Sequence, residues 1–171
     1  SEVSCVLAFP HGCTSSDVKA AEAKAYIVAG TNEIDMVVNF GFVRSGMWDE
    51  VVADIRAVTE VAKPEGVLVK VIFETAYLTV DEIRRTTECA ITANADFVKT
   101  STGFASEGAT EEAVRTMVET AAGRVGVKPS GGIRDRERAE LFIGLGAQRI
   151  GNGFSSTEAI CSGAGSGTGA Y

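Results

Sequence analysis

Two lysines are the residues in this sequence whose positions most clearly suggest chemistry. Lys99 ends an apolar stretch and is followed at once by hydroxyl-bearing residues, and Lys128 ends a later apolar stretch. If Lys99 ends a buried strand, the low dielectric there disfavours its charged form. An uncharged amine can attack a carbonyl carbon and form a Schiff base. The sequence therefore predicts amine catalysis at Lys99, although a lysine in this position can also simply mark the exit of a strand into solvent.

A second lysine and a carboxylate could complete such a site. Neighbouring strands lie about 4.8 Å apart, so the ammonium of Lys128 would disfavour the charge on Lys99 if their strands are adjacent. The alternative is that Lys128 only ends a strand before a turn. Asp35 interrupts another apolar stretch, where a carboxylate is costly without a partner. Two compatible interpretations remain for Asp35: a counter-charge and proton carrier for the lysines, or a salt bridge to Lys70 that holds the core together.

Composition limits the classes of protein to consider. The 171 residues fit one domain with a sizeable core, and 45% hydrophobic and 23% charged residues are typical of a folded protein. A net charge of −7 argues against nucleic-acid partners and anionic membrane surfaces. Four cysteines without metal-binding spacing and a single histidine predict free thiols in a reducing cytoplasm, and argue against a zinc site. Neither a signal peptide nor a membrane span is expected, because no apolar run approaches 18 residues.

Strand and helix patterns alternate along the chain and would position these residues. We predict strands at 4–9, 33–40, 67–73, 124–128 and 148–151, with a further strand that ends at Lys99. We predict helices at 15–29, 47–62, 79–93, 111–122 and 135–145, with Thr79 to Glu82 forming a capping box. Residues 1–161 would form one domain, and the Ser/Gly-rich residues 162–171 a mobile tail.

This alternation predicts βα units on a parallel sheet with right-handed crossovers. Two architectures fit: an open doubly wound sheet and a (β/α)8 barrel. Six strands rather than eight favour the open sheet on count alone. In both architectures ligands gather at the carboxyl ends of the strands, which is where Lys99 and Lys128 would lie.

Two glycine- and hydroxyl-rich turns follow the last two predicted strands. The first contains Gly131 and Gly132, and the second runs from Gly151 to Ser155 and Ser156. Such turns can present backbone amides to a phosphate group, and the loops after the final strands of a barrel often do so. A Gly-Gly turn can also serve backbone geometry alone.

Together these motifs resemble the 2-deoxyribose-5-phosphate aldolases, over nearly the whole chain from Ser4 to Ser156. The resemblance rests on Phe9-Pro10-His11-Gly12 and on the segments 32–39, 69–75, 96–104 and 125–134. The two lysine motifs within the last two segments are the most specific.

The resemblance implies a class I aldolase on a (β/α)8 TIM barrel, with no metal or other cofactor. It implies that Lys99 forms the Schiff base, that Lys128 perturbs it, and that Asp35 relays protons through water. Substrate and phosphate contacts would come from Thr100, Lys70, Gly131, Gly132, Ser155 and Ser156. The implied reaction is reversible cleavage of 2-deoxy-D-ribose 5-phosphate to D-glyceraldehyde 3-phosphate and acetaldehyde in the cytoplasm, and a homo-oligomer is left open.

The sequence also departs from the family pattern. Family members begin with two more βα units, so the six predicted strands would be strands three to eight, and an acidic residue of the family's first strand has no counterpart. The family's Gly-x-Ser-Ser turn carries two additional residues here, before Ser155. Tyr171 could match a tyrosine that ends some members. Two alternatives therefore remain: a truncated or non-catalytic sugar-phosphate-binding scaffold, and a Schiff-base aldolase for another short phosphorylated sugar.

Overall fold

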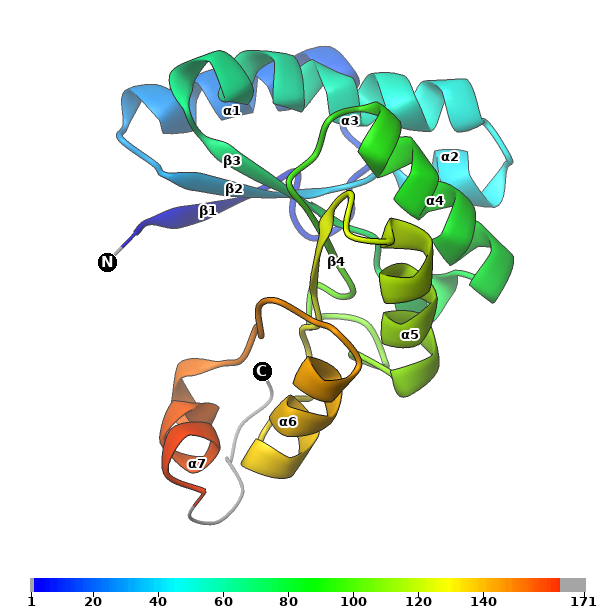
Figure 1. Ribbon diagram of the computed structural model, residues 1–171. Helices are drawn as coiled ribbons and strands as arrows, with labels where there is room; N and C mark the ends of the chain where they lie inside the picture. The colour runs from blue at the N-terminus through cyan, green and yellow to red at the C-terminus, as the bar shows by residue number, and fades with distance from the viewer. Residues whose placement is uncertain (1, 164–171) are drawn as a thin grey trace.

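The computed structural model describes residues 2–163, which form a parallel sheet with helices packed along its outer side (Figure 1). The strands follow one another in sequence order: β1 (Ser4–Leu7), β2 (Glu33–Val37), β3 (Leu68–Ile72), β4 (Phe97–Lys99) and β5 (Gly126–Lys128). The helices are α1 (Ser16–Val28), α2 (Phe40–Arg44), α3 (Trp48–Ala62), α4 (Val80–Thr92), α5 (Glu111–Ala121), α6 (Arg136–Gly144) and α7 (Thr157–Ser162). Three 3₁₀ turns lie at Lys63–Glu65, Thr75–Tyr77 and Phe154–Ser156.

Side-chain caps mark the starts of α4, α5 and α6. The Thr79 side chain accepts a hydrogen bond from the backbone of Glu82, whose side chain accepts one from the Thr79 backbone, so the predicted capping box is confirmed. Thr110 caps α5 and Asp135 caps α6 more simply, each side chain accepting one hydrogen bond from a backbone amide of the first turn. These caps satisfy amides that would otherwise lack partners at the point where each helix leaves the sheet.

Side chains of the strands alternate between two environments. Those that point outward to the helices are apolar and buried, among them Ile34, Met36, Val69, Val98 and Val127. The intervening positions carry the charged residues Glu33, Asp35, Lys70, Lys99 and Lys128, and the pairing register places these on the inner side of the sheet. The outer face thus holds the core, and the inner face holds the charges.

The strand order distinguishes between the two predicted architectures. A doubly wound sheet reverses its strand order and carries helices on both faces, whereas here the order is sequential and α1, α3, α4 and α5 follow one another around one side (Figure 1). The sheet also curves strongly, because Arg149, beyond β5, reaches Glu33 on β2 at 2.6 Å. The fold is therefore an arc of a (β/α) barrel, and the preference for an open sheet on strand count was wrong.

Three local predictions need correction. The predicted strand at 148–151 is reduced to an isolated bridge between Ser130 and Gly151. Two short helices, α2 and α7, were not predicted, and α2 is capped by Asn39, whose side chain accepts hydrogen bonds from two backbone amides. Ser162 ends α7 rather than beginning a tail; the rest of the predicted tail, residues 164–171 with Tyr171, lies outside the described residues.

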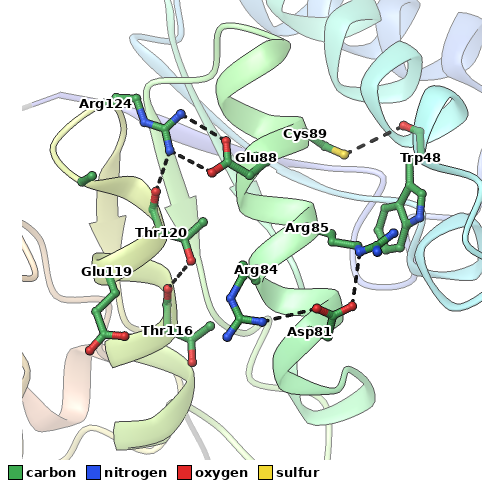
Figure 2. Close-up of a pocket in the computed structure, with 11 residues that line it drawn as sticks. Trp48, Asp81, Arg84, Arg85, Glu88, Cys89, Thr116, Glu119, Thr120 and Arg124 are labelled. Atoms are coloured by element: carbon green, nitrogen blue, oxygen red, sulfur yellow. Dashed lines mark hydrogen bonds and ion pairs between the residues drawn. The ribbon is translucent and has the colours of Figure 1, made fainter.

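A cavity of about 720 Å³ lies between α4 and α5 on the outer side of the helical layer (Figure 2). Many of its polar side chains contact one another: Arg124 donates hydrogen bonds of 2.8 and 3.1 Å to Glu88, and Arg85 lies 5.4 Å from the centre of the Trp48 ring. The cavity is on the opposite side of the sheet from Lys99. It is therefore separate from the predicted chemistry.

Candidate active site

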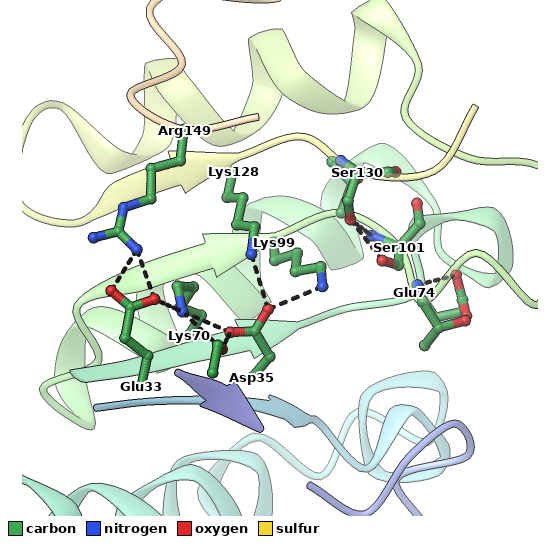
Figure 3. Close-up of polar contacts among 12 residues, drawn as sticks. Glu33, Asp35, Lys70, Glu74, Lys99, Ser101, Lys128, Ser130 and Arg149 are labelled. Atoms are coloured by element: carbon green, nitrogen blue, oxygen red, sulfur yellow. Dashed lines mark hydrogen bonds and ion pairs between the residues drawn. The ribbon is translucent and has the colours of Figure 1, made fainter. Parts of the chain in front are cut away.

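The two predicted lysines meet at one carboxylate on the inner side of the sheet (Figure 3). The Nζ atoms of Lys99 and Lys128 lie 2.9 and 3.0 Å from Oδ2 of Asp35. Lys70 Nζ lies 2.7 Å from the other oxygen, Oδ1. The register explains this meeting, because Lys99 pairs with Lys128 on β4 and β5, and Asp35 pairs with Lys70 on β2 and β3.

Burial and charge act against each other in this cluster. Burial alone would raise the pKa of Asp35, but the ammonium groups of Lys99, Lys128 and Lys70 outweigh it and hold the pKa well below its usual range. Burial, together with the charge of Lys99, lowers the pKa of Lys128. Asp35 thus forms the salt bridge with Lys70 and also lies against both other lysines, as a counter-charge would; its role as a proton carrier stays a prediction.

A second carboxylate, Glu33, extends the cluster and was missed by sequence reasoning. Glu33 Oε2 lies 2.5 Å from Lys70 Nζ, and Arg149 Nη1 donates to both Glu33 oxygens at 2.6 and 2.7 Å. The Arg149 guanidinium also stacks 4.8 Å from the centre of the Phe97 ring. Although burial opposes it, hydrogen bonding from Arg149 and Lys70 lowers the pKa of Glu33 to about 2. The strand period could have revealed Glu33, which lies two residues before Asp35 and so faces the same side.

Lys70 occupies a different position from the one that its predicted role suggests. Its side chain is 0% exposed, and its ammonium lies between Glu33 and Asp35. Lys70 could reach a substrate phosphate only after leaving both carboxylates. A substrate contact for Lys70 stays a prediction, and the observed contacts place this residue within the ionic cluster.

The turns after β4 and β5 are packed backbone against backbone. Thr100 Oγ1 donates to the carbonyl of Ser130 and accepts from its amide, both at 3.0 Å, so this side chain holds the second turn. Gly131 and Gly132 both have positive φ, at 81° and 74°. A Cβ atom on Gly108 would lie 2.2 Å from the Gly131 carbonyl oxygen, so glycine is required at this contact.

Ser155 and Ser156 lie in the 3₁₀ turn that precedes α7. Ser155 is exposed, whereas Ser156 is buried. The Ser156 Oγ atom has no hydrogen-bond partner within residues 2–163. A buried hydroxyl without a partner is costly, so this atom is available to a ligand. Phosphate contacts by Gly131, Gly132, Ser155 and Ser156 stay predictions.

Three general properties bear on the classes considered above. Within residues 2–163, no helix combines the length and apolar character that a membrane span requires. Over the same residues, no group of three or more histidine, cysteine, aspartate or glutamate side chains is placed to hold a metal ion. The four cysteines are free thiols.

Comparisons with known proteins agree with the geometry. A family model described as DeoC/LacD family aldolase matches residues 1–163. The chain is 50% identical over 150 residues to a deoxyribose-phosphate aldolase of Exiguobacterium sp., covering 88% of this chain and 67% of the relative. It is 50% identical over 146 residues to one from Mannheimia succiniciproducens, covering 85% and 64% respectively. The chain thus spans about two thirds of the length of these relatives.

Solved structures show the same likeness. A structure titled "QR15, an Aldolase" superposes with a TM-score of 0.88 at 42% identity, covering 95% of this chain and 72% of that one. The tetrameric deoxyribose phosphate aldolase from Aeropyrum pernix superposes with a TM-score of 0.85 at 31% identity, covering 94% and 67%. Together with the lysine cluster on an arc of a parallel barrel, these matches show that the chain belongs to the DeoC/LacD family of aldolases.

Proposed function

We propose that this chain carries the catalytic centre of a deoxyribose-phosphate aldolase. The reaction is reversible cleavage of 2-deoxy-D-ribose 5-phosphate to D-glyceraldehyde 3-phosphate and acetaldehyde. The observation that carries the proposal is the pair of ammonium groups, the buried Lys99 and the partly buried Lys128, that share one oxygen of Asp35. Relatives that are 50% identical bear the name of this activity, which supports the choice of substrate.

The geometry supplies the parts of a Schiff-base mechanism. The uncharged amine of Lys99 attacks the C1 carbonyl of the open-chain sugar, and loss of water leaves an iminium ion. A base removes the proton of the C3 hydroxyl, the C2–C3 bond breaks, and its electron pair enters the iminium to give an enamine. D-Glyceraldehyde 3-phosphate leaves, C2 is protonated, and water releases acetaldehyde from Lys99. Asp35 and Lys128 would move these protons through water, and their contacts with and beside Lys99 support this role.

The charge balance of the inner face suits a phosphorylated substrate. Four cationic groups surround two carboxylates, although the whole chain carries a net charge of −7. The cationic groups belong to Lys70, Lys99, Lys128 and Arg149, and the carboxylates to Glu33 and Asp35. This surplus of positive charge attracts an anion toward Lys99. The glycine turn at Gly131 and Gly132 and the unpartnered Ser156 hydroxyl would bind the phosphate group itself.

We also propose a cytoplasmic homo-oligomer. The four free thiols, two of which are exposed, suit a reducing compartment. The tetramer named for the Aeropyrum pernix relative supports self-association.

The test is an assay of glyceraldehyde 3-phosphate release from 2-deoxyribose 5-phosphate. We expect Lys99→Ala to abolish the release, because this variant removes the amine that forms the iminium. A matched control is Lys24→Ala, which removes an exposed lysine from α1 and should keep the wild-type rate. A folded wild-type chain that binds the sugar phosphate without cleaving it would favour the non-catalytic scaffold. Cleavage of a different short sugar phosphate alone would favour another Schiff-base aldolase.

A further inference from the structure

Glu74 is a buried carboxylate that the mechanism above does not use. It follows β3 directly, at the carboxyl end of the sheet, and is 2% exposed. Its backbone has φ 56° and ψ 65°, in the left-handed region that residues other than glycine rarely adopt. Burial raises the pKa of Glu74, against hydrogen bonds from Thr102 and the charge of Lys99. A buried acid in a strained backbone is costly, and such features persist where the surroundings hold them for a purpose.

Both oxygens of Glu74 are held by one residue of the loop after β4. The Thr102 amide donates to Oε1 at 3.3 Å, and the Thr102 hydroxyl donates to Oε2. The same hydroxyl accepts from the Phe104 amide at 3.0 Å, which turns the chain just beyond it. Backbone hydrogen bonds from Phe73 to Lys99 and from Thr75 to Thr100 flank this contact. The Glu74 carboxylate therefore fixes the loop that begins immediately after Lys99.

The other end of this loop is attached to the glycine turn after β5. The Ala109 amide donates to the Gly131 carbonyl at 3.0 Å, and Gly108 lies against the same peptide. Residues 100–109 therefore connect the amine of Lys99 with the turn at Gly131; Glu74 holds this loop at Thr102, and the turn after β5 holds it at Thr100 and Ala109. A change at Glu74 would therefore shift the position of Lys99 relative to the turn at Gly131.

We infer that Glu74 is a positioning residue, which acts through Thr102 to set the distance between the Schiff-base lysine and the phosphate-binding turn. This inference rests on the proposed function. It predicts that loss of the Glu74–Thr102 contact lowers kcat/KM for the phosphorylated sugar more than kcat/KM for the unphosphorylated sugar, which reports the chemistry at Lys99 alone. A purely structural role would lower the melting temperature and reduce both equally.

The experiment compares kcat/KM for 2-deoxyribose 5-phosphate and for unphosphorylated 2-deoxyribose. Thr102→Val removes the hydroxyl at nearly constant volume, Glu74→Gln keeps the size but removes the charge, and Thr102→Ser keeps the hydroxyl. Thr92→Val, which removes an exposed threonine hydroxyl from α4, is the matched control. Melting temperatures show which variants remain folded.

We expect Thr102→Val and Glu74→Gln to lower kcat/KM for the phosphorylated sugar by about 10- to 100-fold, the cost of displacing the phosphate-binding turn from Lys99 by about 1 Å. The effect on the unphosphorylated sugar should be several-fold smaller, and Thr102→Ser should recover most of the loss. Equal losses on both sugars, or no loss in a folded variant, would overturn the inference while the aldolase function stands. A folded wild type without activity on either sugar would overturn both.

Discussion

The chain buries lysine–aspartate pairs in two places, and the two places are built differently. On the outer side of the sheet, Lys19 on α1 and Asp54 on α3 pair at 2.6 Å, with neither side chain exposed. On the inner side, the single carboxylate of Asp35 is shared among Lys99, Lys128 and Lys70. The residue types are the same, so the difference lies in how the charges are balanced.

The outer pair is closed. Lys19 also donates to the Val37 carbonyl at 2.9 Å, and Asp54 accepts from the Ser16 hydroxyl and the Asn39 amide. Burial lowers the pKa of Lys19, and Asp54 opposes this. One cation therefore faces one anion, and each also hydrogen-bonds to other groups. These contacts connect α1 and α3 to the end of β2. The inner cluster instead has more ammonium groups than carboxylates, and there burial together with the charge of Lys99 lowers the pKa of Lys128.

Breaking the outer pair should have the largest effect on stability. Asp54→Asn leaves Lys19 buried without its counter-charge, so we expect the free energy of unfolding to fall by about 3–5 kcal/mol. Chemical denaturation measures this change. Glu111→Gln, which breaks an exposed pair with Arg115 on α5, is the matched control and should cost less than about 1 kcal/mol. Similar losses from both variants would mean that burial does not distinguish these pairs.

Changing the inner cluster should instead affect the rate of sugar phosphate cleavage. Lys128→Leu removes the ammonium that repels Lys99 and a group placed to move protons, so we expect activity at neutral pH to fall about 100-fold. The pH–rate profile should move to higher pH, because the repulsion that keeps a neighbouring amine uncharged is gone. Lys24→Leu, on the surface of α1, should leave the profile unchanged. An unmoved profile in Lys128→Leu would disprove its tuning role.

A smaller effect is expected from Glu33, which links the inner cluster to Arg149. Its pKa of about 2 in the folded protein lies below the value of about 4.3 in an unfolded chain. Ionised Glu33 therefore stabilises the fold above about pH 4.3, and this stability is lost as the pH falls through about 2.

Thermal melts of Glu33→Gln and of the wild type test this directly. The gap between their melting temperatures should narrow from about pH 6 to about pH 3. Glu50→Gln, at an exposed position of α3, should follow the wild type throughout. A gap that stays constant with pH would show that Glu33 contributes by packing rather than by charge.

The local features of the fold and the centre of the site could be predicted from the sequence. Alternating strand and helix patterns located the five strands, and the side chains of Thr79 and Thr110 marked two helix starts. Lys99 and Lys128 lie at the ends of adjacent parallel strands, so the strand prediction alone brought them together. Each of these predictions depends on residues that are close in sequence or on the pairing of two consecutive strands.

Contacts between distant segments could not be predicted in this way. Arg149 and Glu33 are 116 residues apart and meet only because the sheet curves into an arc, which no local pattern reveals. Lys19 and Asp54 were hidden in the polar positions of two helices, and only the packing of α1 on α3 buries them. The turn at Ser155 carries two more residues than the family's Gly-x-Ser-Ser pattern, so the sequence predicted its role less well than that of the lysine motifs.

Reductive trapping tests the central claim most directly. The wild-type protein is incubated with 2-deoxyribose 5-phosphate and sodium borohydride, and the adduct is located by intact mass and peptide mapping. We predict a single adduct on Lys99, and none on Lys19, although both lysines are buried beside an aspartate. An adduct on Lys19, Lys70 or Lys128, or no adduct on a folded protein that turns over the sugar, would contradict the assignment of Lys99 as the Schiff-base lysine.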